Sequence, residues 1–302
     1  MGNVASIAQI TPIDQCNVKD MTMCGSDLYV ATNEGYLIFD TKVGETKEMK
    51  TVGNLTSIIA KDQTDLWYIA NLGMSSTINH VKGTETTTYS VANGAIKGGQ
   101  YADVRARGLA YGPNNTVWFG AYGFFHKFDG KEWTNYTCPA SNFGRIYYKC
   151  FAFDSNGTVW VAGSDQQKNA TFGEFDPVKG EQTPVACDFA SDGVNSMFVD
   201  ANDNVWIGTD YKGFYKYDGS TFVNYNKDSE ANIDIKTSAT TGLCQAANGD
   251  IYYAFNKSLV CFSGDYMVVA GTVTNEDHPR DAITCLYPYG EYIFIGTSET
   301  GV

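Results

Sequence analysis

Short runs of alternating apolar and polar residues recur along the whole chain, and each ends in a β-rich phrase built around an aromatic residue. The clearest example has an apolar stretch at residues 194–199 and a second at 205–209, separated by a polar turn. A third stretch at 214–217 passes through an Asp-Gly pair into a fourth at 221–225. This alternation, with an Asp-Gly hairpin signal, predicts four antiparallel strands.

The same phrase occurs seven times, and its central aromatics are Tyr29, Trp67, Trp118, Trp160, Trp206, Tyr252 and Phe294. A spacing of roughly 40–50 residues is typical of a β-propeller, in which each repeat forms one blade. We therefore predict an all-β fold, a single seven-bladed β-propeller over residues 1–302 with four-stranded antiparallel blades. The predicted blades are about 15–54, 55–103, 104–143, 144–190, 191–236, 237–277, and 278–302 together with 1–14.

The two ends of the chain complement each other in this prediction. Only residues 298–302 follow the seventh phrase, so its blade lacks outer strands, whereas the strand-like stretch 4–10 has no blade of its own. Pairing the N-terminal strand into the last blade closes the ring and removes two open sheet edges. The alternative is an open ring, or a fragment of a longer protein.

The phrase at residues 205–219 resembles the repeat of the two-component regulator propeller family. It reads Val-Trp-Ile-Gly-Thr, a short loop, and Gly-Phe-Tyr-Lys-Tyr-Asp-Gly. The resemblance is sharp in the third, fourth and fifth repeats, and streptogramin-lyase propellers are similar. It implies the extracytoplasmic sensor part of bacterial hybrid histidine kinases, commonly linked to carbohydrate sensing. No kinase, transmembrane or second propeller segment follows Val302, so we carry over the fold and a binding role only.

The charge of the chain narrows the classes of partner. The formal net charge is −13, and such a field repels phosphate backbones, so we expect no nucleic-acid partner. No run of about 18 apolar residues occurs, so we expect no membrane insertion. The first six residues lack the charged and apolar regions of a secretory signal. A Met-Gly start that replaces a removed signal is equally compatible with this sequence, which leaves localisation open between cytoplasm, periplasm and exterior.

Eight cysteines are present, without a Cys-x-x-Cys pair that would indicate a zinc or thioredoxin-type motif. Cys24, Cys150, Cys244 and Cys285 each precede an anchor aromatic by a similar short distance, which predicts equivalent positions on inner strands. A small buried hydrophobe fits such a position. Strands in different blades hold most of these residues too far apart to bridge, so we favour reduced core thiols, which are compatible with the cytoplasm, over disulfides.

The arginines are the sharpest candidates for ligand chemistry. The chain has only four, all in loops predicted to lead into an inner strand, and they are Arg105, Arg107, Arg145 and Arg280. A guanidinium group suits carboxylates, phosphates and sugar hydroxyls, so we predict that these four converge at the axial mouth as an anion-binding well. A structural salt-bridge network is the competing interpretation, because Asp20, Asp103 and Asp281 lie in equivalent loops and buried charge must be paired.

Loops that leave the second strands supply further candidates. Tyr122, Asp210 and Tyr211 complete the predicted ligand-binding set with Asp103 and Asp281, and Asp165 and Glu299 lie in similar loops. Residues of these types are individually more often ordinary solvated loop residues. We keep both interpretations for each of them.

Catalytic chemistry is only weakly indicated. The three histidines are separated: His80 and His126 lie on strands, His126 at an expected surface position, and only His278 lies near the mouth. Resemblance to streptogramin lyases would imply two histidines and a glutamate around a magnesium ion at the mouth. The sequence has no diagnostic metal spacing, phosphate loop or nucleophile elbow, so we predict no cofactor, no metal and no catalytic residue.

We therefore expect a non-enzymatic, sensor-like binding module that recognises a small anionic or carbohydrate ligand, or a protein partner, at the axial mouth. One alternative is a structural or attachment component of a larger assembly such as a virion. The other is a metal-dependent lyase or lactonase.

Overall fold

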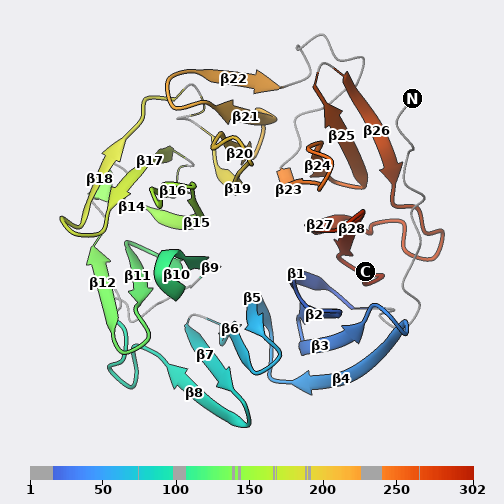
Figure 1. The fold of residues 1–302 in the computed structure, drawn as a ribbon, viewed down its shortest axis with the longest axis horizontal. Coiled ribbons are helices and arrows are strands. Elements are labelled where there is room, and N and C mark those ends of the chain that lie inside the picture. Colours follow the sequence, from blue (N-terminus) through green and yellow to red (C-terminus); the bar gives the residue numbers. More distant parts are fainter. Residues whose placement is uncertain are drawn as a thin grey trace.

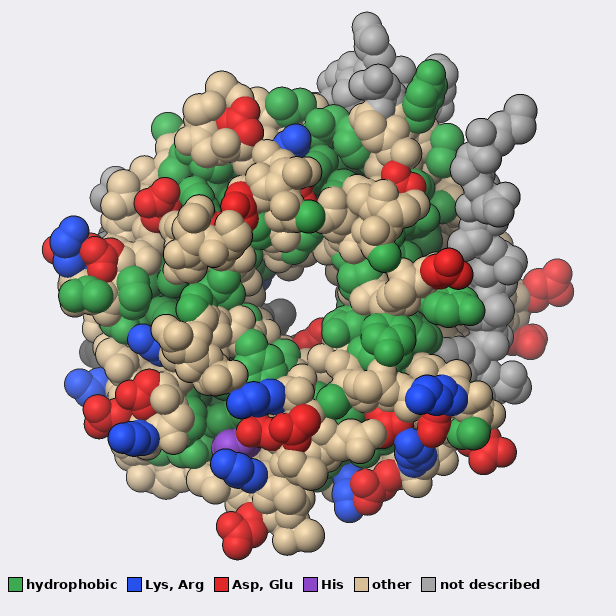
Figure 2. Space-filling model, in the orientation of Figure 1, with side chains coloured by type: hydrophobic (Ala, Val, Ile, Leu, Met, Phe, Trp, Pro, Cys, Tyr) green, Lys and Arg blue, Asp and Glu red, His purple; other side chains and the backbone are tan. Residues whose placement is uncertain are grey.

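The sheets of this protein stand like blades around a central axis (Figure 1). The computed structural model describes residues 16–73, 75–97, 107–137, 140–141, 144–165, 167, 169–187, 189, 192–225, 240–264 and 266–302. Within these ranges the secondary structure is all-β apart from a 3₁₀ turn at Pro113–Asn115. No helix in this part of the chain is long and apolar enough to cross a membrane. Figure 2 shows a hollow at the centre of the ring.

Six sheets have four antiparallel strands in sequence order, from the axis outwards. The first three consist of β1 (Val18–Cys24), β2 (Asp27–Thr32), β3 (Gly35–Asp40) and β4 (Glu45–Thr51); β5 (Leu55–Asp62), β6 (Asp65–Asn71), β7 (Ser76–Lys82) and β8 (Glu85–Tyr89); and β9 (Arg107–Gly112), β10 (Thr116–Ala121), β11 (Phe124–Phe128) and β12 (Trp133–Thr137).

The next three consist of β15 (Tyr147–Phe153), β16 (Val159–Ser164), β17 (Ala170–Asp176) and β18 (Glu181–Pro184); β19 (Val194–Val199), β20 (Val205–Thr209), β21 (Phe214–Tyr217) and β22 (Phe222–Tyr225); and β23 (Thr240–Gln245), β24 (Ile251–Phe255), β25 (Ser258–Ser263) and β26 (Tyr266–Thr272). A short hairpin of β13 (Ala140–Ser141) and β14 (Gly144–Arg145) precedes β15.

A two-stranded sheet of β27 (Ile283–Tyr289) and β28 (Tyr292–Thr297) lies between the β23–β26 and β1–β4 sheets (Figure 1). The innermost strands contact one another in turn around the axis, and β27 touches both β23 and β1. The prediction of a propeller with four-stranded antiparallel blades is confirmed, but the count of seven such blades is not, because the described residues form six. Residues 4–10, which we expected to complete the last blade, lie outside the described residues.

The anchor aromatics lie on the second strands and pack against the neighbouring sheet. The Trp67 ring centroid on β6 is 5.3 Å from that of Phe128 on β11, and the Trp206 centroid on β20 is 6.0 Å from that of Phe262 on β25. One sheet buries its faces only against its neighbours. Truncating a buried aromatic side chain of this size typically costs about 3–5 kcal/mol of stability. These aromatics therefore stabilise the packing between neighbouring sheets.

A repeated aspartate turn connects first and second strands. Asp200, after β19, accepts hydrogen bonds from the backbone N–H groups of Asn202 and Asn204, each at 2.9 Å, and from Trp206 Nε1 at 2.7 Å. Asp154 occupies the same place after β15 and accepts a bond from Trp160 Nε1 at 3.4 Å. The carboxylate therefore closes the turn and also fixes the anchor tryptophan.

A β-bulge recurs near the start of the innermost strands. The register between first and second strands shifts in six sheets, at the second residue of the first strand in five of them and at the third residue in β15. The extra residues are Lys19, Thr56, Lys149, Asn195, Thr241 and Thr284. A bulge leaves one residue outside the ladder and increases the local twist. The strand ends next to the axial loops are therefore built alike around the ring.

The cysteines occupy the predicted positions. Cys24, Cys150, Cys244 and Cys285 lie on the first strands β1, β15, β23 and β27, and all four are unbridged thiols. Burial raises the pKa of Cys150 and of Cys244 to about 12. These thiols are therefore uncharged packing groups.

The expected surface position of His126 is wrong. His126 lies on β11 with 0% of its surface exposed, its ring stacked 4.5 Å from Phe119 and its Nδ1 2.7 Å from Asn135 Oδ1. The strand alternation suggested a solvated face, but neighbouring sheets cover both faces of a blade. Alternation therefore does not separate core from surface here.

Candidate functional site

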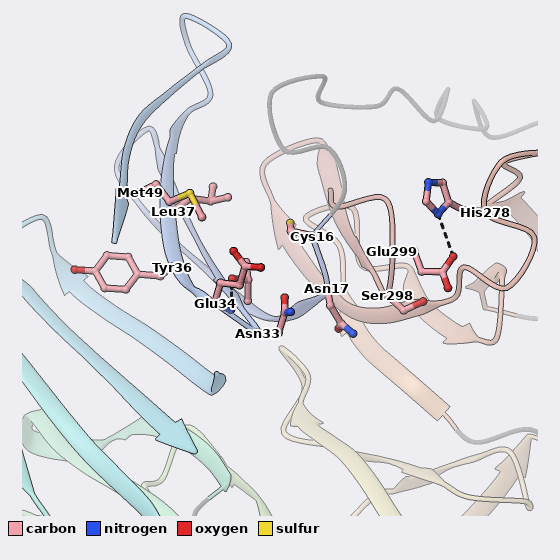
Figure 3. A pocket seen from close by; sticks show the side chains of 11 residues that line it. Cys16, Asn17, Asn33, Glu34, Tyr36, Leu37, Met49, His278, Ser298 and Glu299 are labelled. Carbon is pink, nitrogen blue, oxygen red and sulfur yellow. Dashed lines mark hydrogen bonds and ion pairs between the residues drawn. The ribbon is translucent and has the colours of Figure 1, made fainter. Parts of the chain in front are cut away.

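A cavity of about 650 Å³ opens between the β1–β4 sheet and the loops around β27 and β28. Its lining comes from the segment before β1, the β2–β3 turn, strands β3 and β4, the loop before β27 and the loop after β28. The described lining residues are Cys16, Asn17, Thr32, Asn33, Glu34, Tyr36, Leu37, Met49, His278, Ser298 and Glu299. These loops are of the two kinds that we predicted to form a ligand site. Figure 3 shows Asn17 between Glu34 on one side and Glu299 on the other.

Thr32 shapes the first wall. Its hydroxyl oxygen accepts hydrogen bonds from the N–H groups of Glu34 and Gly35, at 3.1 and 3.2 Å, and donates one to the Gly35 carbonyl at 3.0 Å. Gly35 has a φ of 155°, and a Cβ on it would lie 1.8 Å from the Lys50 carbonyl oxygen. This close approach admits only glycine, so the turn that carries Asn33 and Glu34 has a fixed shape.

Asp281 shapes the opposite wall. This fully buried carboxylate accepts hydrogen bonds from Ser298 Oγ at 3.0 Å, from the Glu299 N–H at 2.8 Å and from the Thr300 hydroxyl. The Ala282 N–H adds a fourth at 3.0 Å. Burial acts to raise the pKa of Asp281, but these hydrogen bonds outweigh it and lower the pKa. The loop that presents Ser298 and Glu299 is thus held by one carboxylate.

The polar side chains of the cavity include both hydrogen-bond donors and acceptors, because the lining contains two amides, two carboxylates and several hydroxyls. Asn33 and Glu34 are exposed, whereas Asn17 Oδ1 is buried and has no hydrogen-bond partner in the described part of the chain. His278 Nδ1 lies 3.2 Å from Glu299 Oε2 (Figure 3). Burial, and to a smaller extent the electrostatic interaction with Tyr68, raises the pKa of Tyr36 to about 12. The phenol of Tyr36 is therefore neutral. The described lining holds two carboxylates and neither lysine nor arginine.

The predicted arginines are not part of this lining as described. Arg105 and Asp103 lie outside the described residues, and only the backbone of Arg107, at the start of β9, and of Arg145, at the end of β14, is described. Arg280 is exposed in the turn before β27. The anion-binding well therefore stays a prediction, while Asp281 is bound by its own loops.

The other predicted residues lie in other blades. The Tyr122 ring centroid is 4.4 Å from that of Tyr147, and Asp210 accepts a hydrogen bond from Asn195 Nδ2 at 2.5 Å. Tyr211 is 56% exposed, and its N–H donates to Asp192 Oδ2 at 2.8 Å. The structure does not bring these residues into the cavity beside Asp281.

Sequence reasoning missed Asn17, Asn33, Glu34 and Tyr36. A usable signal existed, because the threonine of the β2–β3 turn recurs in other sheets. Thr209 donates to the Gly213 carbonyl at 2.9 Å, and Thr297 donates to the Gly301 carbonyl at 2.9 Å. A threonine at the end of the second strand followed by a glycine three or four residues later marks this loop, and Thr32 with Gly35 fits the pattern.

One repeat of the chain matches a known family. The family model of the two component regulator propeller matches residues 188–211, which contain β19 and β20, and this confirms the resemblance of the fifth repeat. Comparison with curated protein sequences finds no significant match.

Solved structures resemble the whole chain in fold. Catalytically inactive virginiamycin B lyase from Staphylococcus aureus with quinupristin has a TM-score of 0.73 at 11% identity, over 96% of this chain and 96% of that chain. The extracellular domain of a protein described as a hybrid two component system, from B. thetaiotaomicron, has a TM-score of 0.70 at 14% identity, over 100% of this chain and 39% of that chain. PorZ, a bacterial surface component of the type-IX secretion system of Porphyromonas gingivalis, has a TM-score of 0.58 at 12% identity, over 92% of this chain and 49% of that chain. At these identities the likeness shows the fold.

Proposed function

We propose that this propeller is a non-enzymatic binding module that holds a small carbohydrate in the cavity between the β1–β4 sheet and the β27–β28 loops. The observation that carries the proposal is the mixed polar lining of the cavity, in which the amide of Asn33 and the carboxylate of Glu34 are exposed. Amides and carboxylates bond well to sugar hydroxyls, which both donate and accept hydrogen bonds. Tyr36 and Met49 add apolar surface. The volume of about 650 Å³ falls within the range of small-molecule sites.

The family match supports a sensor-like role. One repeat matches the two component regulator propeller, and one solved structure with the same fold is an extracellular domain of a two component system. Function belongs to the site rather than to the fold, so this likeness is secondary to the cavity. The arginine well remains the proposed site for an anionic ligand or for the acidic side chain of a protein partner. A role without nucleic acid agrees with the net charge of −13.

A lyase is the second candidate, and the His278–Glu299 contact favours it. A histidine and a carboxylate 3.2 Å apart can exchange a proton with a bound substrate, and a lyase shares the fold. Turnover of a streptogramin in the presence of a divalent metal, lost in His278→Ala, would support this candidate over a binding module. A stoichiometric protein assembly in native mass spectrometry would instead support a structural role.

The first prediction tests the carbohydrate site. Asn33→Ala removes an exposed amide from the cavity lining, so we expect the affinity for the best-bound neutral sugar of a mono- and disaccharide panel to fall about tenfold, the worth of one hydrogen bond. Isothermal titration calorimetry measures the change. Asn156→Ala is the matched control, because Asn156 is also exposed but lies in the turn between β15 and β16, away from the cavity. Equal losses in both variants would contradict the assignment of the cavity.

The second prediction concerns the blade count. We propose that β27 and β28 are the inner half of a seventh blade and that residues 4–10 supply an outer strand. The partly buried apolar residues Phe294 and Tyr287 already pack with Val18 of the first sheet. Deleting residues 1–14 should expose the edge of this blade and lower the free energy of unfolding by about 2–3 kcal/mol, the worth of one or two buried apolar side chains. Chemical denaturation measures it, and unchanged stability would refute the paired strand.

A further inference from the structure

We propose that two copies of this chain associate by pairing their β26 strands edge to edge, antiparallel, across a twofold axis. β26 (Tyr266–Thr272) is the last strand of the β23–β26 sheet, and Figure 1 shows it on the rim of the ring. Among the described residues no further strand pairs with it, so its outer edge presents unpaired backbone N–H and C=O groups. β26 is not part of the cavity lining as described, so this inference does not rest on the carbohydrate site.

β26 exposes more large apolar side chains than the other outer strands. Tyr266, Val268 and Val269 are 76%, 49% and 48% exposed, whereas β4, β8, β12, β18 and β22 each expose at most one large apolar side chain. Figure 2 shows hydrophobic side chains on this part of the rim, at the upper right of the ring. Exposed aromatic and β-branched residues on a free strand edge favour the addition of another strand.

β26 also lacks the features that protect a strand edge from pairing. Charged residues, proline and bulges are the usual protection, and β4 contains glutamates and lysines, β8 contains Glu85, and β18 contains Glu181 and Pro184. β12 and β22 are uncharged but have little exposed apolar surface. β26 contains no charged residue and no proline, and its one bulge lies at Ala270, so residues 266–269 form a regular and accessible edge.

The sequence of β26 is complementary to itself in one antiparallel register. A twofold axis at Val268 places Val268 opposite its counterpart in the second copy, Met267 opposite Val269, and Tyr266 opposite Ala270. An axis perpendicular to the sheet keeps every side chain on its own face, and alternate residues share a face, so the paired side chains match. Each pair is uncharged, and apolar cross-strand pairs stabilise a sheet. A slip of one residue would instead bring together side chains from opposite faces.

The charge of the chain favours a second copy as the occupant of this edge. Each copy carries a net charge of −13, so two copies repel each other wherever their carboxylates face one another. Residues 266–275 contain no carboxylate, which makes this edge a place where two acidic copies can meet. A basic partner would be attracted to the acidic parts of the surface instead, since this edge offers it no opposite charge.

Sedimentation velocity on the full chain tests the association. Pairing of one strand buries less surface than a standard interface, so we expect a dissociation constant of about 10–100 μM. Concentrations from about 1 to 300 μM bracket this value. Added salt should leave the dimer intact or strengthen it, because salt screens the repulsion between two acidic copies.

Two lysine variants test the strand. Val268→Lys places two like charges opposite each other at the axis, so we expect the dissociation constant to rise at least about tenfold. Val223→Lys is the matched control, because Val223 is 47% exposed on β22, the outer strand of the neighbouring sheet, and this variant should dimerise like the wild type. Chemical denaturation verifies that both variants are folded.

A cysteine at the axis tests the register. Opposite Cα atoms of an antiparallel pair lie about 4.5–5.5 Å apart, a separation that a disulfide spans. Val268→Cys should therefore form a covalent dimer under mild oxidation, whereas Val223→Cys should not. The wild type, treated in the same way, controls for the native thiols.

The second copy is the wrong occupant if the full chain stays monomeric at every concentration. A dimer that survives in Val268→Lys, or that Val223→Lys weakens equally, overturns the assignment to β26. A monomer that dimerises only after deletion of residues 1–14 overturns the inference in favour of the chain's own N-terminal stretch at this edge. Loss of the dimer in Val268→Lys alone, together with cross-linking of Val268→Cys alone, supports the β26 pair.

Discussion

Asp281→Ala should lower the free energy of unfolding by about 4 kcal/mol, because it leaves several buried donors without an acceptor. The donors are the Ala282 and Glu299 N–H groups and the hydroxyls of Ser298 and Thr300. Urea denaturation measures the loss. The same substitution should abolish ligand binding, since the loop that carries Ser298 and Glu299 loses its anchor.

Asp277→Ala is the matched control for this prediction. Asp277 lies in the same loop and is exposed, and the described donors of the β28 loop bond to Asp281 instead. The loss of free energy in Asp277→Ala should therefore stay within about 0.5 kcal/mol. Asp281→Asn keeps one acceptor oxygen and should fall between the two. The contribution of Asp281 also depends on pH: its pKa is lowered in the fold, so its stabilisation is present above the ordinary carboxyl pKa and is lost as the pH falls through the lowered value. A loss in Asp277→Ala as large as in Asp281→Ala would contradict the anchor.

The second large effect is a pair of opposed pH dependences. Burial lowers the pKa of His126 from 6.5 to about 4, so the unfolded chain binds the proton first and stability falls between about pH 6.5 and 4. Burial raises the pKa of Asp20 from 3.8 to about 6, although bonds from Ser57 Oγ at 2.7 Å and the Ile58 N–H at 3.0 Å oppose it. The folded chain takes up this proton first, so stability rises as the pH falls from about 6 to 4. Each change is about 3 kcal/mol, and the two nearly cancel.

Single variants should separate the two contributions. Relative to the wild type, Asp20→Asn should lose about 3 kcal/mol between pH 7 and 4, because only the fall from His126 remains. His126→Phe should gain a similar amount over the same interval, since only the rise from Asp20 remains. The double variant should again follow the wild type, because the two sites lie in different sheets and act independently. Denaturant titrations at each pH measure these differences, and parallel profiles for all four proteins would disprove the assignment.

Most of the fold could be predicted from the repeat, because the spacing of the repeats and the alternation of apolar and polar residues are visible in a single sequence. The aromatics from Trp67 to Trp206 mark second strands, and the Asp-Gly pair at Asp218 marks a hairpin. Alternation failed at His126, because a blade has two covered faces. Strand order alone gave no indication of the bulges at positions such as Lys149.

The site was less accessible to sequence reasoning than the fold. The ligand site expected at the axial mouth stays a prediction. His278 and Glu299, from loops of the expected kind, line the observed cavity, but so do Leu37 of β3 and Met49 of β4. The sequence analysis placed the site in other blades, because it selected loops by their rare arginines. The turn at Asn33 and Glu34 contains common polar residues and gave no comparable signal. Asp281 is an example: the sequence alone does not distinguish a loop aspartate that contacts a ligand from one that accepts hydrogen bonds from four donors of its own chain.

The hydrogen bond from a threonine hydroxyl to a glycine carbonyl, which closes the turn after a second strand, also bears on how such a chain can change its specificity. Thr32 closes on Gly35 with two residues between them, whereas Thr209 and Thr297 close on Gly213 and Gly301 with three. The hydrogen bond therefore forms with either number of intervening residues. After Thr297, the intervening Ser298 and Thr300 also bond to Asp281, which ties that turn to its own blade. The turn at Asn33 and Glu34 is instead closed by Thr32 and Gly35, so its two side chains can be exchanged, by recombination or by design, while β2 and β3 keep their register.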